Sequence, residues 1–289
     1  MAEIAPTVMQ KPAGNPLANY FRQPKIYIRL PSEGEFYPPG SLDVSANGEY
    51  AVFAMTAKDE LLFKTPDALM NGQATIEVIK SCVPSIKDPW KMPSIDVDAV
   101  LVAIRIATYD KNMDIGAKCP QCGNLNEYEF NLLTYLEQMN NFKYDSKINA
   151  DPLIVTIRPY NYHETTKAAI KAIEQQKIFQ IVNDETLSEE EKLDKFGLSF
   201  LKLTELTVEV ICGCIASIET PEGVVTDQAQ IKDFINNAPS DIFNKINDHV
   251  SAMRNDIEMK TQTVACTECT HEYQISITMD QSNFFAVRS

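Results

Sequence analysis

Two distant stretches of the chain share one pattern: GAKCPQCGNLNEYEFNL at residues 116–132 and TVACTECTHEYQISITM at residues 263–279. Each has two cysteines separated by two residues and then a run in which apolar and polar residues alternate. A Cys-x-x-Cys turn directs two sulfurs and several backbone N–H groups toward one point, and alternation is typical of a strand. Each stretch therefore predicts a cysteine-bearing turn followed by a strand.

Together the two turns predict a metal site. The thiolates of Cys119, Cys122, Cys266 and Cys269 would complete the tetrahedral shell of a zinc ion of the ribbon type, with bonds of about 2.3 Å. His271 follows the second turn and is an alternative ligand, although four thiolates already satisfy the metal. Because four thiolates leave no position for water, we expect a structural zinc and not a catalytic one.

Two other interpretations of these cysteines stay open at this point. They are reduced buried thiols without a metal, or one pair is a redox dithiol, although neither pair lies in a thioredoxin-like βαβ context. The seven cysteines, an odd number, do not resemble a secreted disulfide framework. Cys82, Cys212 and Cys214 are expected to be small core residues, since the last two stand two positions apart on a predicted helix and point to different faces.

The separation of the two turns indicates the fold class. Compact ribbons separate their cysteine pairs by about 15–20 residues, whereas more than a hundred residues, mostly helical in pattern, lie between Cys122 and Cys266. We expect an α+β chain with small antiparallel sheet elements and a zinc-ribbon-like double knuckle that encloses a large, mostly helical insertion. The metal would tie the two ends of the insertion together and close this long loop.

Composition and periodicity divide the chain into four parts. Residues 1–24 are rich in Pro, Ala, Asn and Gln without apolar periodicity, which is typical of an extended arm. An N-terminal α+β domain with the first cysteine turn is expected over 25–135, and the mostly helical insertion over 136–260. A C-terminal hairpin over 261–289 is expected to pack back on residues 116–132.

Local signals predict the elements of the first half. Alternating runs at 25–31 and 49–55 indicate strands of a small antiparallel sheet. Start and stop signals predict helices between Thr65-Pro66 and Asn71-Gly72, over 73–82, and from a cap at Ser94 or Asp96 through Tyr109.

The second half opens with a β-branched run bounded by prolines, which predicts a strand over 152–159. Ser188 and Glu191 have the spacing of a capping box, which marks the start of a helix. Further helices are expected over about 162–182, 198–218, 227–236 and 239–258.

The charge balance argues against several classes of partner. Lys and Arg number 26 against 40 Asp and Glu, a net charge of −14. Because phosphate contact depends on Lys and Arg, we expect neither nucleic-acid binding nor docking on an anionic membrane. No apolar run approaches the roughly 18 residues that span a bilayer, and the N-terminal sequence lacks the apolar region of a signal peptide. Synthesis and retention in a cytosol are therefore expected.

Signatures of catalysis are absent from the sequence. It contains no GxxxxGK[ST], GxGxxG or GxSxG motif. His163 and His249 stand near predicted helices without a nucleophile or carboxylate motif beside them. The acidic run 184–194 lacks the spacing of a calcium loop and is interpreted as a solvated helix start. We therefore expect a protein that is not an enzyme and takes no small-molecule substrate.

Several segments in order resemble a known family. IRLPSEGEFYPPGS at 28–41, AKDELLF at 57–63, AIRIATY at 103–109 and CPQCG at 119–123 follow one another as in the baseplate hub subunits of T-even-like contractile-tailed phages. The resemblance covers roughly residues 25–135. The matching positions are Leu30, Pro31, Ser32, Gly34, Tyr37, Pro38, Cys119 and Cys122.

The resemblance implies a non-catalytic structural or assembly component of the tail baseplate, associated with the hub or the wedge. Its partners would be other tail proteins, and its locations the host cytoplasm during assembly and then the virion tail. Exposed rings are costly without a partner, so the residues expected to contact one are Tyr20, Phe21, Phe36, Tyr37 and Pro38. The alternative for Phe36 and Tyr37 is that both rings fold back on their own domain.

Two other functions compete with this one. A zinc-ribbon module that binds nucleic acid or acts in transcription would require a local basic face, yet Lys118 is the only Lys or Arg between residues 112 and 142, and none lies between 261 and 287. An enzyme with an unrecognised site would use two converging carboxylates.

Overall fold

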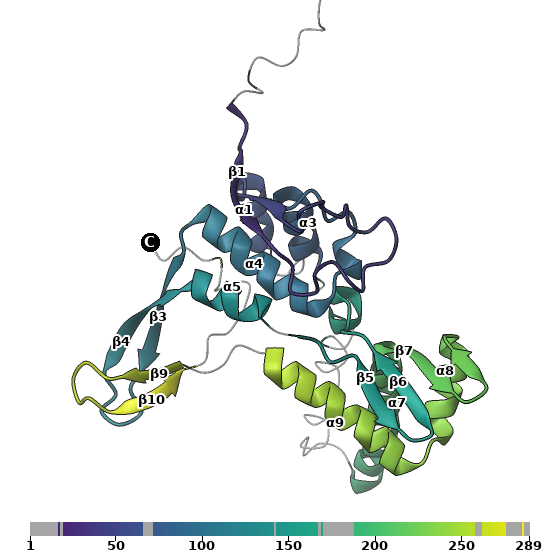
Figure 1. The fold of residues 1–289 in the computed structure, drawn as a ribbon. Coiled ribbons are helices and arrows are strands. Elements are labelled where there is room, and N and C mark those ends of the chain that lie inside the picture. Colours follow the sequence, from purple (N-terminus) through teal and green to yellow (C-terminus); the bar gives the residue numbers. More distant parts are fainter. Residues whose placement is uncertain are drawn as a thin grey trace, which may run out of the picture.

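The computed structural model describes residues 17, 20–65, 72–141, 143–166, 169, 188–257, 262–275 and 285. Figure 1 shows three parts: a mostly helical body, a pair of two-stranded hairpins, and a sheet with helices beside it. The class is α+β with small antiparallel sheets and a knuckle-like cluster of four cysteines, as the sequence predicts.

The body is built around one central helix. Its elements are β1 (Pro24–Ile28), β2 (Tyr50–Phe53), α1 (Ala57–Phe63), α3 (Gln73–Cys82), the 3-10 turn η2 (Pro89–Lys91), α4 (Ser94–Thr108) and α5 (Leu132–Asn140). Along α4, every residue from Ala99 to Ile104 is at most 1% exposed. A helix that is apolar on all sides must be covered on all sides. We call the cluster around α4, which includes Val52, Ile79 and Leu132, the first core.

The start of α4 differs in detail from the expectation. Pro93 occupies the N-cap position and Ser94 is the first helical residue, so neither Ser94 nor Asp96 caps the helix. Asp96 instead turns inward, where its carboxylate accepts hydrogen bonds from the Ser32 amide at 2.9 Å and from the Ser32 hydroxyl. Burial raises the pKa of Asp96 to about 6, while the Ser32 hydrogen bonds act in the opposite direction. A residue expected to cap its own helix therefore fastens a distant loop to it.

A second core lies under a four-stranded antiparallel sheet. The sheet order is β5 (Lys147–Ala150), β6 (Leu153–Ile157), β7 (Ile215–Thr220), β8 (Gly223–Val225). The helices of this part are α7 (Glu189–Cys214), α8 (Gln228–Asn237) and α9 (Ser240–Ile257). Val155, Ile218, Ile231 and Ile246, each at most 3% exposed, belong to the second core.

The expected helix over 198–218 is wrong at both ends. The capping box of Ser188 and Glu191 is present as predicted, but it opens one continuous helix, α7, that runs to Cys214. From Ile215 the chain is a strand, because β7 pairs with β6 on one side and with β8 on the other. The backbone N–H and C=O groups of β7 form their hydrogen bonds with the two neighbouring strands, whereas those of a helix would bond within the helix. The local sequence does not reveal such strand pairing.

Other sequence predictions fall partly outside the described residues. The short helix expected between Thr65-Pro66 and Asn71-Gly72 lies almost wholly there, and Gly72 forms the left-handed N-cap of α3 (φ 77°). The helix expected over 162–182 is described as helical at 162–166 and at residue 169. Helices α3, α8 and α9 match their predicted ranges to within two residues.

The two hairpins project away from the body and meet each other (Figure 1). The first hairpin, β3 (Asn112–Lys118) with β4 (Leu125–Asn131), follows α4 and leads directly into α5. The second hairpin, β9 (Gln262–Ala265) with β10 (Glu272–Ile275), comes from the far end of the sequence.

Near the C-terminus, Phe285 packs in the first core. Its ring stacks on Phe63 with centroids 4.5 Å apart and planes 7° apart, and its carbonyl accepts a hydrogen bond from the Tyr109 hydroxyl at 3.2 Å. Phe285 is 6% exposed. A residue near the C-terminus therefore packs in the same core as β1 and β2.

Candidate metal centre

The two cysteine turns have the same backbone structure. In the first, the Cys119 amide donates to the Asn124 carbonyl at 2.8 Å and the Gly123 amide donates back to the Cys119 carbonyl at 3.0 Å. In the second, the Cys266 amide donates to the His271 carbonyl at 2.9 Å and the Thr270 amide donates to the Cys266 carbonyl at 3.0 Å. The cysteines therefore occupy equivalent positions in two turns with the same backbone hydrogen-bond pattern.

Each turn contains a left-handed residue immediately after its second cysteine. Gly123 has a φ of 76° and Thr270 a φ of 58°. Glycine takes this conformation without steric cost, whereas a β-branched residue is strained in it. The second turn thus reaches the same shape with a less suitable residue.

The four sulfurs form a compact group. The Sγ atoms of Cys119 and Cys269 lie 3.7 Å apart, those of Cys122 and Cys266 lie 3.6 Å apart, and all four ligand atoms lie within 4.8 Å of one another. A tetrahedral metal with sulfur bonds of about 2.3 Å has neighbouring sulfurs about 3.8 Å apart. A disulfide would bring two sulfurs to about 2.05 Å. The geometry therefore fits a tetrahedral four-thiolate metal site and not a disulfide.

Exposure differs within each turn in the same way. The first cysteine of each turn, Cys119 or Cys266, is 2% exposed, whereas Cys122 is exposed and Cys269 is partly exposed. Backbone hydrogen bonds from Cys269, and then from Glu268, lower the pKa of the Cys266 thiol. Such hydrogen bonds favour the thiolate, the form that binds a metal.

Side chains near the sulfurs tie the hairpins together, and the sequence analysis did not identify them. The Tyr128 hydroxyl donates to the Ala265 carbonyl at 2.9 Å and lies 3.1 Å from the Tyr273 hydroxyl. Asn126, 2% exposed, bonds to residues of both turns. Their positions in the sequence could have indicated these residues, because Asn126 and Tyr273 each stand four residues after the second cysteine of their turn.

The remaining cysteines and His271 lie outside this group. His271 stacks on Tyr273, with ring centroids 6.4 Å apart, and in the described part of the chain the candidate metal-binding group consists of the four cysteines. Cys82 is buried in the first core and Cys212 in the second, and Cys214 is 1% exposed. These three have the core positions that the sequence predicts.

The expected partner-contact residues separate into two groups. Tyr20 and Phe21 are 85% and 59% exposed. Phe36 instead packs edge-on against Tyr144 with centroids 5.6 Å apart, and Tyr37 packs against the first core. Pro38, beside them, is exposed. The rings of the loop thus fold back on the chain, while those near the N-terminus face solvent.

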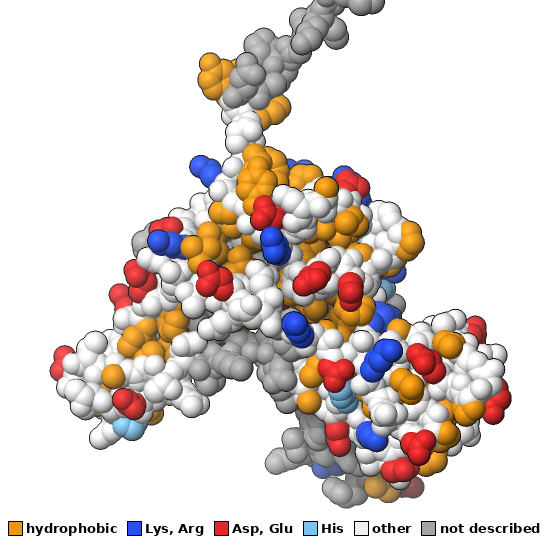
Figure 2. Space-filling view, in the orientation of Figure 1, with side chains coloured by type: hydrophobic (Ala, Val, Ile, Leu, Met, Phe, Trp, Pro, Cys, Tyr) orange, Lys and Arg blue, Asp and Glu red, His pale blue; other side chains and the backbone are white. Residues whose placement is uncertain are grey.

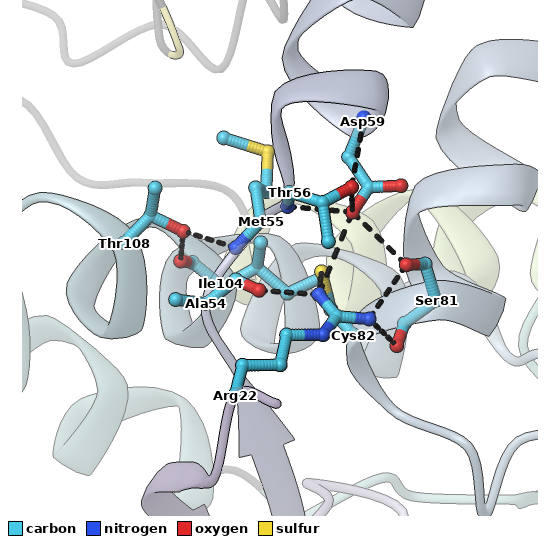
Figure 3. A network of polar contacts seen from close by, with 9 residues as sticks. All are labelled: Arg22, Ala54, Met55, Thr56, Asp59, Ser81, Cys82, Ile104 and Thr108. Atoms are coloured by element: carbon cyan, nitrogen blue, oxygen red, sulfur yellow. Dashed lines mark hydrogen bonds and ion pairs between the residues drawn. The ribbon is translucent and has the colours of Figure 1, made fainter. Parts of the chain in front are cut away.

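Arg22 anchors the segment that bears Tyr20 and Phe21, as Figure 3 shows. Its guanidinium donates to the Ala54 carbonyl and to the carbonyl and hydroxyl of Ser81, and it lies 3.5 Å from the Asp59 carboxylate. The same carboxylate closes the capping box of α1 with Thr56. The sequence predicted that Arg22 belongs to the extended arm. In the structure, Arg22 instead contacts the body directly.

A groove of about 540 Å³ opens beside this anchor. Its lining includes Phe21, Phe53, Met55 and Pro84. Figure 2 shows hydrophobic side chains gathered on the body next to the N-terminal segment.

None of the helices in the described ranges is both long and apolar enough to cross a membrane.

Comparison with known proteins places the chain. A profile of the family described as T4 bacteriophage base plate protein matches residues 43–286, which includes both cysteine turns. No curated protein and no solved structure shows significant similarity. The match covers most of the 289 residues, and the chain therefore belongs to the T4 bacteriophage base plate protein family.

Proposed function

We propose that this protein is a non-catalytic structural or assembly component of the phage tail baseplate, associated with the hub or the wedge and held together by a structural zinc ion. The family match over residues 43–286 is the observation that supports the baseplate role. The four-sulfur group supports the metal. The protein would fold in the host cytoplasm and join other tail proteins there before it enters the virion.

Zinc is the metal that the ligand set favours. Four thiolates in a tetrahedron suit Zn²⁺, while Mg²⁺ and Ca²⁺ prefer oxygen ligands. The four sulfurs would fill the coordination shell, so the ion would act as a cross-link.

By this proposal, the chain is divided into an arm over 1–24, a first domain over 25–135, an insertion over 136–260 and a C-terminal hairpin over 261–289.

Metal analysis of the purified full chain tests the zinc. We expect one zinc per chain by inductively coupled plasma mass spectrometry, lost in Cys122→Ser and retained in Cys212→Ser, whose sulfur lies in the second core. A parent protein that contains no zinc and takes up none when zinc is added would contradict this part of the proposal.

The surface that we assign to a partner lies at the base of the arm. Tyr20 and Phe21 are exposed, and Phe21 borders an apolar groove. Solvated aromatic rings beside an apolar groove fit the apolar side chains of another tail protein. Phe36, Tyr37 and Pro38 extend the proposal to the neighbouring loop, where Pro38 has the exposed position.

Phage particles assembled with substituted protein test this surface. The double variant Tyr20→Ser/Phe21→Ser should lower the copy number of this chain per baseplate while its melting temperature stays unchanged. Val224→Ser, which changes a side chain of 64% exposure on β8, is the matched control and should assemble normally. Equal incorporation of both variants would remove the partner role from this surface.

Quantitative mass spectrometry of purified particles separates a permanent part from an assembly factor. A fixed copy number per tail identifies a permanent component, whereas abundance in infected cells and absence from particles identifies a factor that leaves.

Nucleic-acid binding is not expected, because the charged residues of the two hairpins are mostly acidic and would repel phosphate. They are Asp114, Lys118, Glu127, Glu129, Glu268 and Glu272. Salt-sensitive DNA binding by the purified protein would favour the zinc-ribbon alternative instead.

A further inference from the structure

A single buried side chain connects the two cysteine turns. Asn126 on β4 is 2% exposed and reaches Cys266 and Thr267, which are 140 and 141 residues away in the sequence. We propose that Asn126 is the positioning residue of the metal centre, which selects the second turn as the partner of the first and orients the Cys266 sulfur. This inference rests on the proposed metal site.

The acceptor side of the carboxamide holds the second turn. Its Oδ1 accepts hydrogen bonds from the Thr267 amide at 3.0 Å and from the Thr267 hydroxyl at 2.8 Å. The Thr267 amide lies directly after the ligand Cys266. Because the carboxamide of Asn126 is buried and its oxygen needs donors, this contact fixes the turn at its first ligand.

The donor side faces the sulfur. Nδ2 donates to the Asn124 carbonyl at 3.1 Å and lies 3.6 Å from Cys266 Sγ and 3.4 Å from the Tyr273 hydroxyl. Only one orientation of the amide suits these neighbours, since the Thr267 N–H can only donate and the Asn124 carbonyl can only accept. A neutral donor beside a ligand sulfur stabilises the thiolate and restricts its position.

The equivalent contact is impossible in the first turn. Pro120 stands where the second turn has Thr267, and proline has no N–H to donate. Tyr273 stands where the first hairpin has Asn126, and its hydroxyl lies 3.4 Å from the Ala117 carbonyl. If two copies of the chain paired their first hairpins, each Asn126 oxygen would face Pro120 and lose both Thr267 donors, keeping the Asn124 side-chain amide at 3.3 Å. Asn126 therefore favours the pairing of the two turns within one chain over pairing between chains.

Cobalt titration of the full chain tests this role, because thiolate–Co²⁺ charge-transfer bands report on the ligand sulfurs. Asn126→Asp keeps the size and the acceptor but places a carboxylate beside the thiolates. We expect it to weaken Co²⁺ binding by about 10- to 100-fold, as loss of an outer-shell partner does, and to shift the charge-transfer band. Glu127→Gln makes the opposite change at the next, exposed residue of the same strand and should behave like the parent.

A milder variant protects the test against misfolding. Thr267→Val removes one hydroxyl donor with little change in shape, and should weaken Co²⁺ binding less than Asn126→Asp while circular dichroism stays unchanged. If both variants bind Co²⁺ with the affinity and the spectrum of the parent, or lose only melting temperature, the positioning role is overturned. If the parent itself binds neither Co²⁺ nor Zn²⁺, the proposed metal site fails, and this inference fails with it.

Discussion

The two hairpins are alike where they meet and unlike where they join the rest of the molecule. The first is continuous with α4 and α5, and it buries Met113 in the first core, with Ile115 and Phe130 packed against that core. The second touches the first through Tyr128 and Asn126, near the sulfurs. The two hairpins bear similar turns, but they are held differently. The first hairpin packs against the hydrophobic core, whereas the second is joined to the first by polar contacts and by the cysteine cluster.

This difference indicates which part of the fold would depend on the proposed metal. A hairpin of two short strands is at best marginally stable by itself. The first hairpin is stabilised in addition by its contacts with the first core, whereas the second would depend on the first hairpin and on the proposed shared ion. Metal-binding free energy becomes folding free energy where the apolar core is small. The second hairpin should consequently be the region that metal removal unfolds.

The largest expected effect is that of a ligand substitution. Cys122→Ser and Cys269→Ser should each release the metal and lower the free energy of unfolding by on the order of 4 kcal/mol or more, because loss of a metal is among the most damaging single changes. Urea unfolding measures the total loss. Hydrogen exchange should show lost protection at β9 and β10 and retained protection at β3 and β4.

Cys212→Ser is the control for this pair, since it alters a thiol of the second core and should leave the metal content unchanged. The comparison of the hairpins would be broken if the first hairpin lost its protection as readily as the second.

The next largest effect should come from the C-terminal contact. Phe285→Ala removes a buried ring that stacks on Phe63, so we expect a loss of about 3 kcal/mol, as for other buried Phe→Ala changes. Zinc content should not change, because the ring lies in the first core and not beside the sulfurs. Thermal unfolding with parallel metal analysis measures both. Phe21→Ala, at an exposed ring, is the control and should change stability little.

The contribution of Asp96 to the pH dependence of stability should be the same with and without metal, whereas thiolate ligation of zinc adds a pH dependence of its own. Burial raises the pKa of Asp96 to about 6 in the folded protein, above its usual value of about 3.9 when unfolded. Asp96 then binds more protons in the folded state between about pH 4 and pH 6, so its contribution to stability falls as the pH rises through this range, by on the order of 3 kcal/mol. Denaturation of the parent and of Asp96→Asn across this range checks the sign.

Asp96→Asn should flatten this part of the profile, both in the zinc-bound protein and after chelation. If the difference between the parent and Asp96→Asn disappeared after chelation, Asp96 would be linked to the hairpins and its assignment to the first core would be contradicted.

The smallest effects should have opposite signs in the two turns. Gly123→Ala places a side chain on a residue with a φ of 76°, and should cost about 1 kcal/mol. Thr270→Gly relieves a β-branched residue at a φ of 58°, and should gain up to about 0.5 kcal/mol after the greater chain entropy of glycine is offset. Melting temperatures of the zinc-bound variants measure both. Changes of the same sign would show that the two turns are not equivalent.

Local patterns in the sequence were sufficient for much of this fold. The spacing of Cys119, Cys122, Cys266 and Cys269 predicted two turns whose sulfurs converge, and the alternating runs after them predicted β4 and β10. The capping box at Ser188 correctly marked the start of α7. These features depend on neighbours within a few residues, and such spacing is written directly in the sequence.

Features that depend on distant partners could not be predicted in this way. Ile215–Thr220 is a strand because two other strands flank it, and Phe36 is half-buried because Tyr144 lies beside it. Asp96 binds Ser32 instead of capping its helix, since folding brings that loop against α4.

The sequence by itself determined that four cysteines form two similar turns, that the chain is α+β, and that its net charge is −14. Only the tertiary structure decided that Asn126 joins the turns, that Phe285 closes on the first core, and that Arg22 fixes the base of the arm. The physical reason is the same in each case. A buried polar group or ring takes its role from the partner it meets, and that partner lies tens to hundreds of residues away.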